Sequence, residues 1–203
     1  DPEVKSAIMD AVEKIKERGG AVEDVSLPSL DLALGCYYVL VPAEISSNLA
    51  RYDGIRYGHS SKEAKSINDQ FFMSRNEGFG DEAKRRIMIG TYVLSSGYYD
   101  AYYKKAQKVR TLIRKDFDGA FKNYDFLIGP TSPIKPWNLG EKSHDPLAMY
   151  LTDIDTVAVN LVGSPAISIP LKTDDLPVGL QLVGPQKSEQ KLLSAAAGLE
   201  GLS

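Results

Sequence analysis

The sequence predicts an α/β protein in which helices cover a mixed β-sheet. Residues 4–18 have helical periodicity and are followed closely by a β-branched segment at 21–27. A short apolar run at 125–130 is typical of a buried strand, and two further strand-like runs, 166–170 and 178–184, are joined by a connection of hairpin length. Helices that alternate with short strands in this way are characteristic of α/β proteins.

The helical segments carry different hydrophobic patterns. Residues 4–18 place one apolar stripe between a helix start at Asp1-Pro2 and a stop at Gly19-Gly20. Residues 81–95 become apolar on every side after Arg86, which predicts a buried helix. Further helices are expected over residues 29–51, with Pro42 as a kink or break, and over 98–122, 146–161 and 188–200, with loops at 51–60 and 131–145.

Composition and charge exclude several classes of protein. Hydrophobic residues make up 43% of the 203 residues and charged residues 25%, and the net charge is −3. Neither wholesale disorder nor a strongly basic nucleic-acid surface is therefore expected. No apolar run has the length of a transmembrane helix, and the N-terminus lacks a signal peptide. No association with a membrane is therefore expected. The single cysteine, Cys36, cannot form an internal disulfide, which favours a reducing compartment and predicts a cytoplasmic protein.

Short catalytic motifs do not occur in the sequence. It has no phosphate-binding loop, no GxSxG elbow and no HExxH or CxxC zinc motif. His59 and His144 lie in polar, loop-like surroundings and are expected to be surface residues. Cys36 is expected to be a buried thiol, and Ser95-Ser96-Gly97 the end of a helix. Tyrosines and bases between 98 and 115 leave two interpretations open, a nucleic-acid face or a helix that packs its tyrosines inward.

Several longer strings occur in a fixed order along the chain. They are Tyr37-Tyr38, the segment 43–58 with Asn48-Leu49-Ala50-Arg51-Tyr52-Asp53-Gly54 at its centre, Glu77-Gly78-Phe79-Gly80, Lys84-Arg85-Arg86-Ile87, the segment 90–103, Pro130-Thr131-Ser132-Pro133 and Asn160-Leu161-Val162-Gly163-Ser164-Pro165-Ala166-Ile167-Ser168-Ile169-Pro170. Together they resemble the amidase signature family over essentially the whole chain. The strings at 48–54 and 77–80 favour one branch of it, the glutaminase subunits of tRNA-dependent amidotransferases, over general amidases.

The resemblance extends to the C-terminal part of the amidase signature fold alone. In the family, the catalytic lysine and two serines lie in the N-terminal half, and this sequence has no Gly/Ser-rich segment of the kind that carries the nucleophile. The resemblance therefore implies a single partial domain over residues 1–203 with no catalytic residue of its own. We expect an abnormally exposed sheet edge or face, because its neighbours belong to the other half.

The same branch implies a reaction and partners. In the whole enzyme a serine attacks the side-chain amide of glutamine, and the released ammonia is carried to the B-subunit. The B-subunit uses ATP and Mg²⁺ to amidate Glu-tRNA(Gln), the C-subunit braces the pair, and this chain is expected to bind no cofactor itself. Two alternatives remain, a fragment of a general amidase-signature amidohydrolase and a non-catalytic substrate-binding or scaffolding module.

By motif position, the resemblance also implies a substrate clamp in this chain. Arg86 would bind the α-carboxylate of glutamine, Asp153 would bind its α-ammonium, and Tyr37 would line the same pocket. A planar guanidinium suits a carboxylate because it binds both oxygens at once. The alternatives are a structural salt bridge for Arg86, a solvated helix face for Asp153 and a core aromatic for Tyr37. The segment 51–54 and Glu44 are expected to form a hydrogen-bonded structural network or to contact a partner.

Overall fold

The computed structural model describes residues 1–141, 146–173 and 176–200. It divides the chain into two compact units, a first unit of residues 1–34 with 110–203 and a second unit of residues 35–109, and each is described by itself. The single partial domain expected over residues 1–203 stays a prediction. His144 lies outside the described residues. Within the described part of the chain, no helix is long and apolar enough to cross a membrane.

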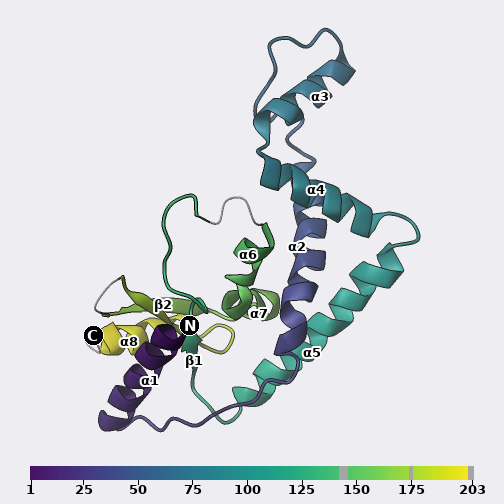
Figure 1. The fold of residues 1–203 in the computed structure, drawn as a ribbon. Coiled ribbons are helices and arrows are strands. Elements are labelled where there is room, and N and C mark those ends of the chain that lie inside the picture. The colour runs from purple at the N-terminus through teal and green to yellow at the C-terminus, as the bar shows by residue number, and fades with distance from the viewer. Residues whose placement is uncertain (142–145, 174–175, 201–203) are drawn as a thin grey trace. The chain divides into compact units, whose positions relative to one another are not determined.

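A three-stranded sheet organises the first unit (Figure 1). Its strands are β1 (Leu127–Pro130), β2 (Ala166–Leu171) and β3 (Val178–Val183), in the order β1-β3-β2. Both neighbouring pairs are antiparallel, and Leu180 of the central strand lies opposite Pro130 on one side and Ile169 on the other. The α/β class and the three C-terminal strands are confirmed. The pairing among the described strands is antiparallel rather than mixed.

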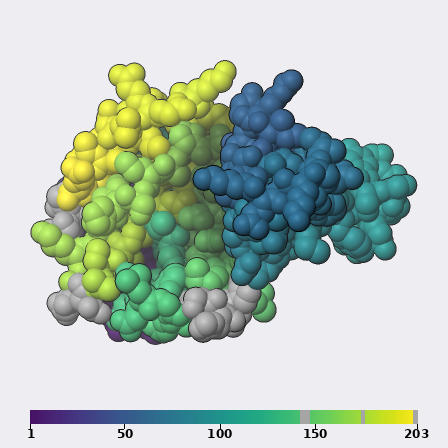
Figure 2. Space-filling view, turned by 90° about the horizontal axis from the view of Figure 1, so that it is seen from above, coloured from purple at the N-terminus to yellow at the C-terminus, as the bar shows by residue number. Residues whose placement is uncertain are grey.

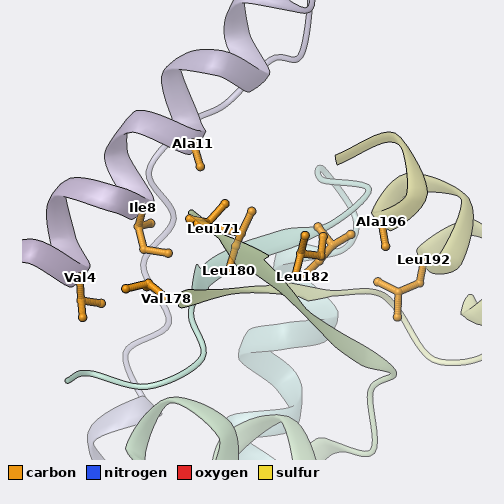
Figure 3. Close-up of a cluster of buried hydrophobic side chains, with 10 residues drawn as sticks. Val4, Ile8, Ala11, Leu171, Val178, Leu180, Leu182, Leu192 and Ala196 are labelled. Carbon is orange, nitrogen blue, oxygen red and sulfur yellow. The ribbon is translucent and has the colours of Figure 1, made fainter. Parts of the chain in front are cut away.

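Two helices cover one face of this sheet, α1 (Pro2–Glu17) and α8 (Glu189–Leu199). Asp1 caps α1 by accepting a hydrogen bond from the backbone N–H of Glu3, as the sequence predicts. Figure 3 shows the side chains of α1 and α8 pointing toward those of the strands. The core consists of Val4, Ile8, Ala11, Ile169, Leu171, Val178, Leu180, Leu182, Leu192 and Ala196.

The opposite face of the sheet is more open. Strand β2 alternates, so that Ile169 and Leu171 are buried whereas Ala166, Ser168 and Pro170 are exposed. This exposed face of β2 agrees with the expectation of an exposed sheet face. Helix α7 (Ile154–Val162) lies on this side, since Gln181 donates from Nε2 to the carbonyl of Asp155 at 3.0 Å.

One predicted helix, 146–161, consists of two helices. Helix α6 (Pro146–Leu151) ends before Thr152, and α7 begins after Asp153. The hydroxyl of Thr152 donates to the carbonyl of Met149 at 2.6 Å, which is a local bond that competes with helix continuation. The interruption moves Asp153 from the middle of a helix to the N-cap position of α7.

The strand predicted at 21–27 is wrong. These residues have no regular secondary structure, and most of them, including Val25, are exposed. A strand needs a hydrogen-bonding neighbour, and none of the described strands pairs with this segment. Its attachment is polar instead, because the hydroxyl of Tyr124 donates to the carboxylate of Glu23 at 2.9 Å.

The second unit is helical. After the short 3-10 turn η1 (Leu30–Leu32) of the first unit, the helices are α2 (Ala33–Leu49), α3 (Ile67–Gly78), α4 (Asp81–Leu94), the π-helical turn η2 (Tyr99–Tyr103) and α5 (Lys104–Ala120), whose second half belongs to the first unit. The helices predicted over 29–51, 81–95 and 98–122 are confirmed, and α2 runs through Pro42 without a break. Helix α3 was not predicted from the sequence, although Ser66 caps it by accepting from the N–H of Asp69.

Helices α2 and α4 approach each other closely at Gly90. A side chain on Gly90 would overlap the backbone carbonyl of Pro42 and come within 2.7 Å of the hydroxyl of Ser46. Glycine is therefore what permits this contact between the two helices. One turn earlier on each helix lie Arg86 and Tyr38.

The prediction that α4 is buried on every side is wrong. Gly90 and Val93 are buried against the rest of the second unit, but Met88 is 73% exposed and Tyr92 is 49% exposed. The described residues of this unit bury one face of α4 and leave Met88, Ile89 and Tyr92 exposed. In Figure 2, the segment of α3 and α4 forms part of the molecular surface.

Hydrogen bonds hold the loop that joins α2 to α3. The buried hydroxyl of Ser74 accepts from the N–H of Ser61 at 3.0 Å and from Nε2 of Gln70 at 2.7 Å. Asp53 accepts from the N–H of Ile55 at 2.8 Å, and Gly54 has a φ of +79° with no room for a side chain beside Ser74. Hydrogen bonds of Asp53 and of the Tyr52 carbonyl thus support the network expected around residues 51–54, whereas the part of Glu44 in it stays a prediction. A partner contact there stays a prediction.

Candidate functional site

Arg86 lies where α2 and α4 meet. Its guanidinium carbon lies 5.9 Å from the ring centroid of Tyr38, a cation–π distance. The ring of Tyr37 meets that of Tyr38 edge to face, with centroids 5.2 Å apart. Both tyrosines are partly buried. Arg86 and Tyr37, two of the three predicted clamp residues, therefore belong to one group of contacts in the second unit.

Glu82 completes the surroundings of Arg86. Nε of Arg86 donates to Oε1 of Glu82 at 2.8 Å, and the other carboxylate oxygen of Glu82 pairs with Arg85. Partial burial lowers the pKa of Arg86, but the hydrogen bond and charge of Glu82, with smaller contributions from Tyr38 and Tyr37, outweigh it and raise that pKa. Sequence reasoning missed Glu82, although its spacing of four residues from Arg86 on a helix is the signal of such a pair.

Asp153 belongs to the first unit, where it precedes α7. Its backbone carbonyl accepts from both the N–H and the hydroxyl of Thr156, each at 3.0 Å. The residue lines a cavity of about 470 Å³ beside the open sheet face. The walls of this cavity are Thr131, Ser132, Ile134, Pro136, Trp137, Thr152, Asp153, Thr156, Ser168, Pro177, Val178 and Gly179.

A second cavity of about 380 Å³ lies on the same side of the sheet. It is lined by Thr131, Thr156, Val159, Asn160, Ser164, Ala166, Ile167, Ser168 and Gln181. Thr131, Thr156 and Ser168 line both cavities, so the two depressions adjoin at these three hydroxyls. None of the three was singled out as a site residue from the sequence, because isolated Ser and Thr carry no spacing signal.

Asp155 is a further polar group near these cavities that sequence reasoning missed. Its Oδ2 atom is buried without a hydrogen-bond partner. Burial raises the pKa of this carboxyl, since the charged form loses hydration.

The other candidate nucleophiles and bases have structural roles. The ring of His59 is half exposed and pairs with Glu77, Nε2 to Oε2, at 2.7 Å. Cys36 is buried, and its thiol donates to the carbonyl of Ala106. Ser95 ends α4 and donates from its hydroxyl to the carbonyl of Tyr92. The expectations for His59, Cys36 and Ser95 are confirmed.

Neither interpretation of the segment 98–115 describes it fully. Tyr98 and Tyr102 pack against Tyr92 on the surface rather than turning inward, with centroids 4.2 Å and 6.3 Å from the Tyr92 ring. Two of the bases are engaged elsewhere, since Arg110 donates to the carbonyl of Leu161 at 2.6 Å and Arg114 donates to the last residue of α7. These arginines thus stabilise the C-terminal end of α7.

Metal-ligating side chains do not gather in the described ranges. No group of three or more His, Cys, Asp or Glu there could hold an ion. The two candidate regions offer a cation at Arg86 and a carboxylate with several hydroxyls at Asp153, which can recognise a ligand by charge and hydrogen bonds.

Comparison with known proteins decides the family. The family model described as Amidase matches residues 1–193. The chain belongs to this amidase family. The resemblance noted in the sequence is confirmed, and with it the amidase signature fold.

Two curated relatives of the chain have the same name, that of the A-subunit of glutamyl-tRNA(Gln) amidotransferase. The chain is 56% identical over 200 residues to the A-subunit from Halothermothrix orenii, a match that covers 98% of this chain and 42% of that protein. It is 52% identical to the A-subunit from Azotobacter vinelandii, over 97% of this chain and 41% of that protein. The chain thus spans about two fifths of the length of these amidase-family relatives.

Solved structures agree with this assignment. The crystal structure of the glutamyl-tRNA(Gln) amidotransferase A-subunit from Thermotoga maritima superposes with a TM-score of 0.69 at 36% identity, over 95% of this chain and 37% of that one. A bacterial aryl acylamidase of the amidase signature family superposes with a TM-score of 0.74 at 20% identity, over 100% of this chain and 41% of that one. The second likeness supports the fold alone.

Proposed function

We propose that this chain is the C-terminal portion of the glutaminase subunit, or A-subunit, of a glutamyl-tRNA(Gln) amidotransferase. The observation that carries the proposal is the match of nearly the whole chain, at 52–56% identity, to proteins of that name. The complete polypeptide hydrolyses glutamine and supplies the ammonia that converts Glu-tRNA(Gln) into Gln-tRNA(Gln). This portion contributes recognition of glutamine, and the catalytic lysine and serines come from the rest of the polypeptide.

At one end of the proposed clamp, Arg86 binds the α-carboxylate of glutamine. The guanidinium is oriented before a ligand arrives, because Glu82 holds Nε and the Tyr38 ring lies against it. Such preorganisation lowers the entropy cost of binding. Tyr37 lines the carboxylate site beside Arg86. Burial opposes a raised pKa of Arg86, but the hydrogen bond and charge of Glu82 outweigh it, and the raised pKa favours the charged guanidinium that the α-carboxylate needs.

At the other end of the proposed clamp, Asp153 binds the α-ammonium. Asp153 lines a cavity with a volume of about 470 Å³, which is ample for one amino acid. A carboxylate in a partly closed cavity favours an ammonium over a neutral group, because a charged hydrogen bond is roughly twice as strong as a neutral one. A guanidinium for the carboxylate and a carboxylate for the ammonium each favour free α-amino acids over other amides.

The proposed function includes partners that this chain does not contain. The B-subunit takes up the ammonia and uses ATP and Mg²⁺ to amidate the glutamyl-tRNA, and the C-subunit braces the other two. The chain itself uses no cofactor, and a cytoplasmic location remains a prediction. Copurification of the full-length protein with subunits B and C distinguishes this proposal from a general amidase that acts without tRNA.

The clamp is tested in the full-length protein within its complex. We expect Arg86→Ala and Asp153→Ala each to lower kcat/KM for glutamine about 30-fold or more, since each strands an opposite charge at a cost of roughly 2–5 kcal/mol. Arg85→Ala is the matched control, because Arg85 pairs with the same Glu82 but is not part of the clamp. Amidation driven by ammonium chloride should stay near wild type in all three variants, since it bypasses glutamine.

Two outcomes contradict the clamp. If glutamine kinetics stay near wild type in Arg86→Ala and Asp153→Ala, these residues do not bind the substrate. If the glutamine-dependent and ammonium-dependent activities fall together, the residues are structural. Separately, ammonia release from glutamine by the isolated 203-residue chain, blocked by a serine-directed reagent, would place a nucleophile in this portion and overturn the division of roles.

A further inference from the structure

A pair of hydroxyls lies where the two cavities of the first unit adjoin. Thr131 follows β1 and Ser168 lies on β2, and their hydroxyl oxygens are 2.7 Å apart. Strand β3 runs between these two strands, so the backbones of Thr131 and Ser168 are separated by about 9–10 Å of sheet. The two side chains lean toward each other across the central strand.

Gly179 of β3 allows the hydroxyls to meet. A Cβ atom on Gly179 would lie 2.5 Å from Oγ of Ser168 and 2.7 Å from Oγ1 of Thr131. The N–H of Thr131 also donates to the carbonyl of Gly179 at 2.8 Å, which fixes Thr131 against the strand. The hydroxyl pair is therefore positioned by the sheet itself rather than by mobile side chains.

The chemistry of the pair matches a group that donates several hydrogen bonds. Two hydroxyls offer four oxygen lone pairs, and their mutual hydrogen bond uses one of them. An ammonium presents N–H groups that a single carboxylate cannot all accept. The pair lines the same cavity as Asp153, and Thr156, which is hydrogen-bonded to the Asp153 carbonyl, lines it too.

We propose that the Thr131–Ser168 hydroxyl pair is a second contact of the substrate's α-ammonium and completes its hydrogen bonding beside Asp153. The inference rests on the proposed function, since it assumes that Asp153 faces an α-ammonium. It adds Thr131 and Ser168 as specificity-determining residues and Gly179 as the positioning residue that brings them together.

The experiment uses the full-length protein in its complex and two ligands. Glutamine carries the α-ammonium, and 4-carbamoylbutanoate is the same molecule without it, used as a competitive inhibitor. We expect Thr131→Val and Ser168→Ala each to lower kcat/KM for glutamine roughly tenfold or more, as a hydrogen bond to a charged group is lost. The inhibition constant of 4-carbamoylbutanoate should change less than about twofold, because that ligand makes no such bond.

Gly179→Ala provides an independent variant with a matched control. Its methyl group pushes the two hydroxyls apart, so it should reproduce the selective loss for glutamine. Gly129→Ala is the control on the neighbouring strand, because a Cβ atom there has no atom within 4 Å. We expect Gly129→Ala to bind both ligands as the unmodified enzyme does.

The outcomes separate this inference from the function on which it rests. Two outcomes overturn the inference. If Thr131→Val and Ser168→Ala weaken glutamine use and 4-carbamoylbutanoate binding equally, the hydroxyls are structural. If they weaken neither, the hydroxyls do not contact the substrate. Asp153→Asn is measured in parallel. A selective loss in Asp153→Asn without one in Thr131→Val and Ser168→Ala rejects the hydroxyl pair alone, whereas no selective loss in Asp153→Asn rejects the ammonium site itself.

Discussion

In the first unit, Leu180 lies at the centre of an apolar core and has 0% of its surface exposed. In the second unit, helices α2 and α4 meet where Gly90 lies against the carbonyl of Pro42. The core around Leu180 is stabilised by apolar surface that becomes buried between α1, α8 and the sheet. The second unit depends on the absence of a side chain and on hydrogen bonds to buried hydroxyls such as that of Ser74. We therefore expect the removal of a buried methyl group to destabilise the first unit. The addition of a methyl group, or the removal of a hydroxyl, should destabilise the second.

The largest expected effect tests the apolar core. Leu180→Ala should lower the free energy of unfolding by about 2–5 kcal/mol, because it removes buried methyl groups and leaves a cavity. Leu193→Ala on α8 is the control, since Leu193 is 59% exposed and should change stability by less than about 0.5 kcal/mol. Urea unfolding of both variants measures the difference. Equal effects would show that this cluster does not stabilise the fold.

The next effect tests the helix contact of the second unit. Gly90→Ala should destabilise by about 1–3 kcal/mol, because the added methyl group overlaps the Pro42 carbonyl. Gly35→Ala is also a helical substitution, but its methyl group would have no atom within 4 Å. It should instead stabilise by roughly 0.5–1 kcal/mol through helix propensity. Thermal melts that show Gly90→Ala to be neutral would contradict the close approach of α2 and α4.

An effect of similar size but more local extent is expected at Ser74. Ser74→Ala leaves the N–H of Ser61 without its acceptor, at a cost of about 1–3 kcal/mol. Hydrogen exchange should speed up for residues 54–61 and stay unchanged in the sheet of the first unit. Ser194→Ala on α8 removes an exposed hydroxyl and serves as the control. A uniform change along the chain would mean that Ser74 supports more than this loop.

The smallest effect concerns pH and the pair of His59 with Glu77. The hydrogen bond from His59, followed by that from Ser61, lowers the pKa of the Glu77 carboxyl below its ordinary value near 4.5. Stability from this group is thus fully present above that ordinary value and is lost as the pH falls through the lowered one. The protection of residues 54–61 from exchange, measured relative to the intrinsic exchange rate at each pH, should therefore fall on acidification below about pH 4.5 in the unmodified chain. Glu77→Gln should show no such step, and an identical step in both would assign it to another group.

Elements with a local signal could be predicted from the sequence. Helix α1 has a capping aspartate and an apolar stripe, and β2 and β3 combine short, largely apolar runs with a short connection, so their positions follow from neighbouring residues. The segment 21–27 has similar residues but no pairing strand, and α4 has apolar residues that the described chain does not cover. Both errors have one cause, since the sequence indicates what a segment is suited to bury but not what lies beside it.

The candidate site also contains residues that the sequence indicates and residues that only the fold brings together. Arg86 and Asp153 were reached through motif resemblance, and the grouping of Arg86 with Tyr38 depends on a helix contact that Gly90 permits. The hydroxyls of Thr131 and Ser168 are 37 residues apart in the chain and meet because of strand order. No spacing rule predicts such a pair, because sheet topology is decided by pairings distant in sequence.

Trp137 lines the larger cavity of the first unit and is the one tryptophan among the 203 residues. Indole emission shifts in wavelength and intensity with the polarity of its surroundings and with nearby quenching groups. Tryptophan fluorescence in this chain therefore comes from Trp137 alone, in the wall of the cavity that Asp153 also lines. Ligands that enter this cavity can be followed by fluorescence titration of the unlabelled polypeptide, without a dye, a coupled enzyme or turnover.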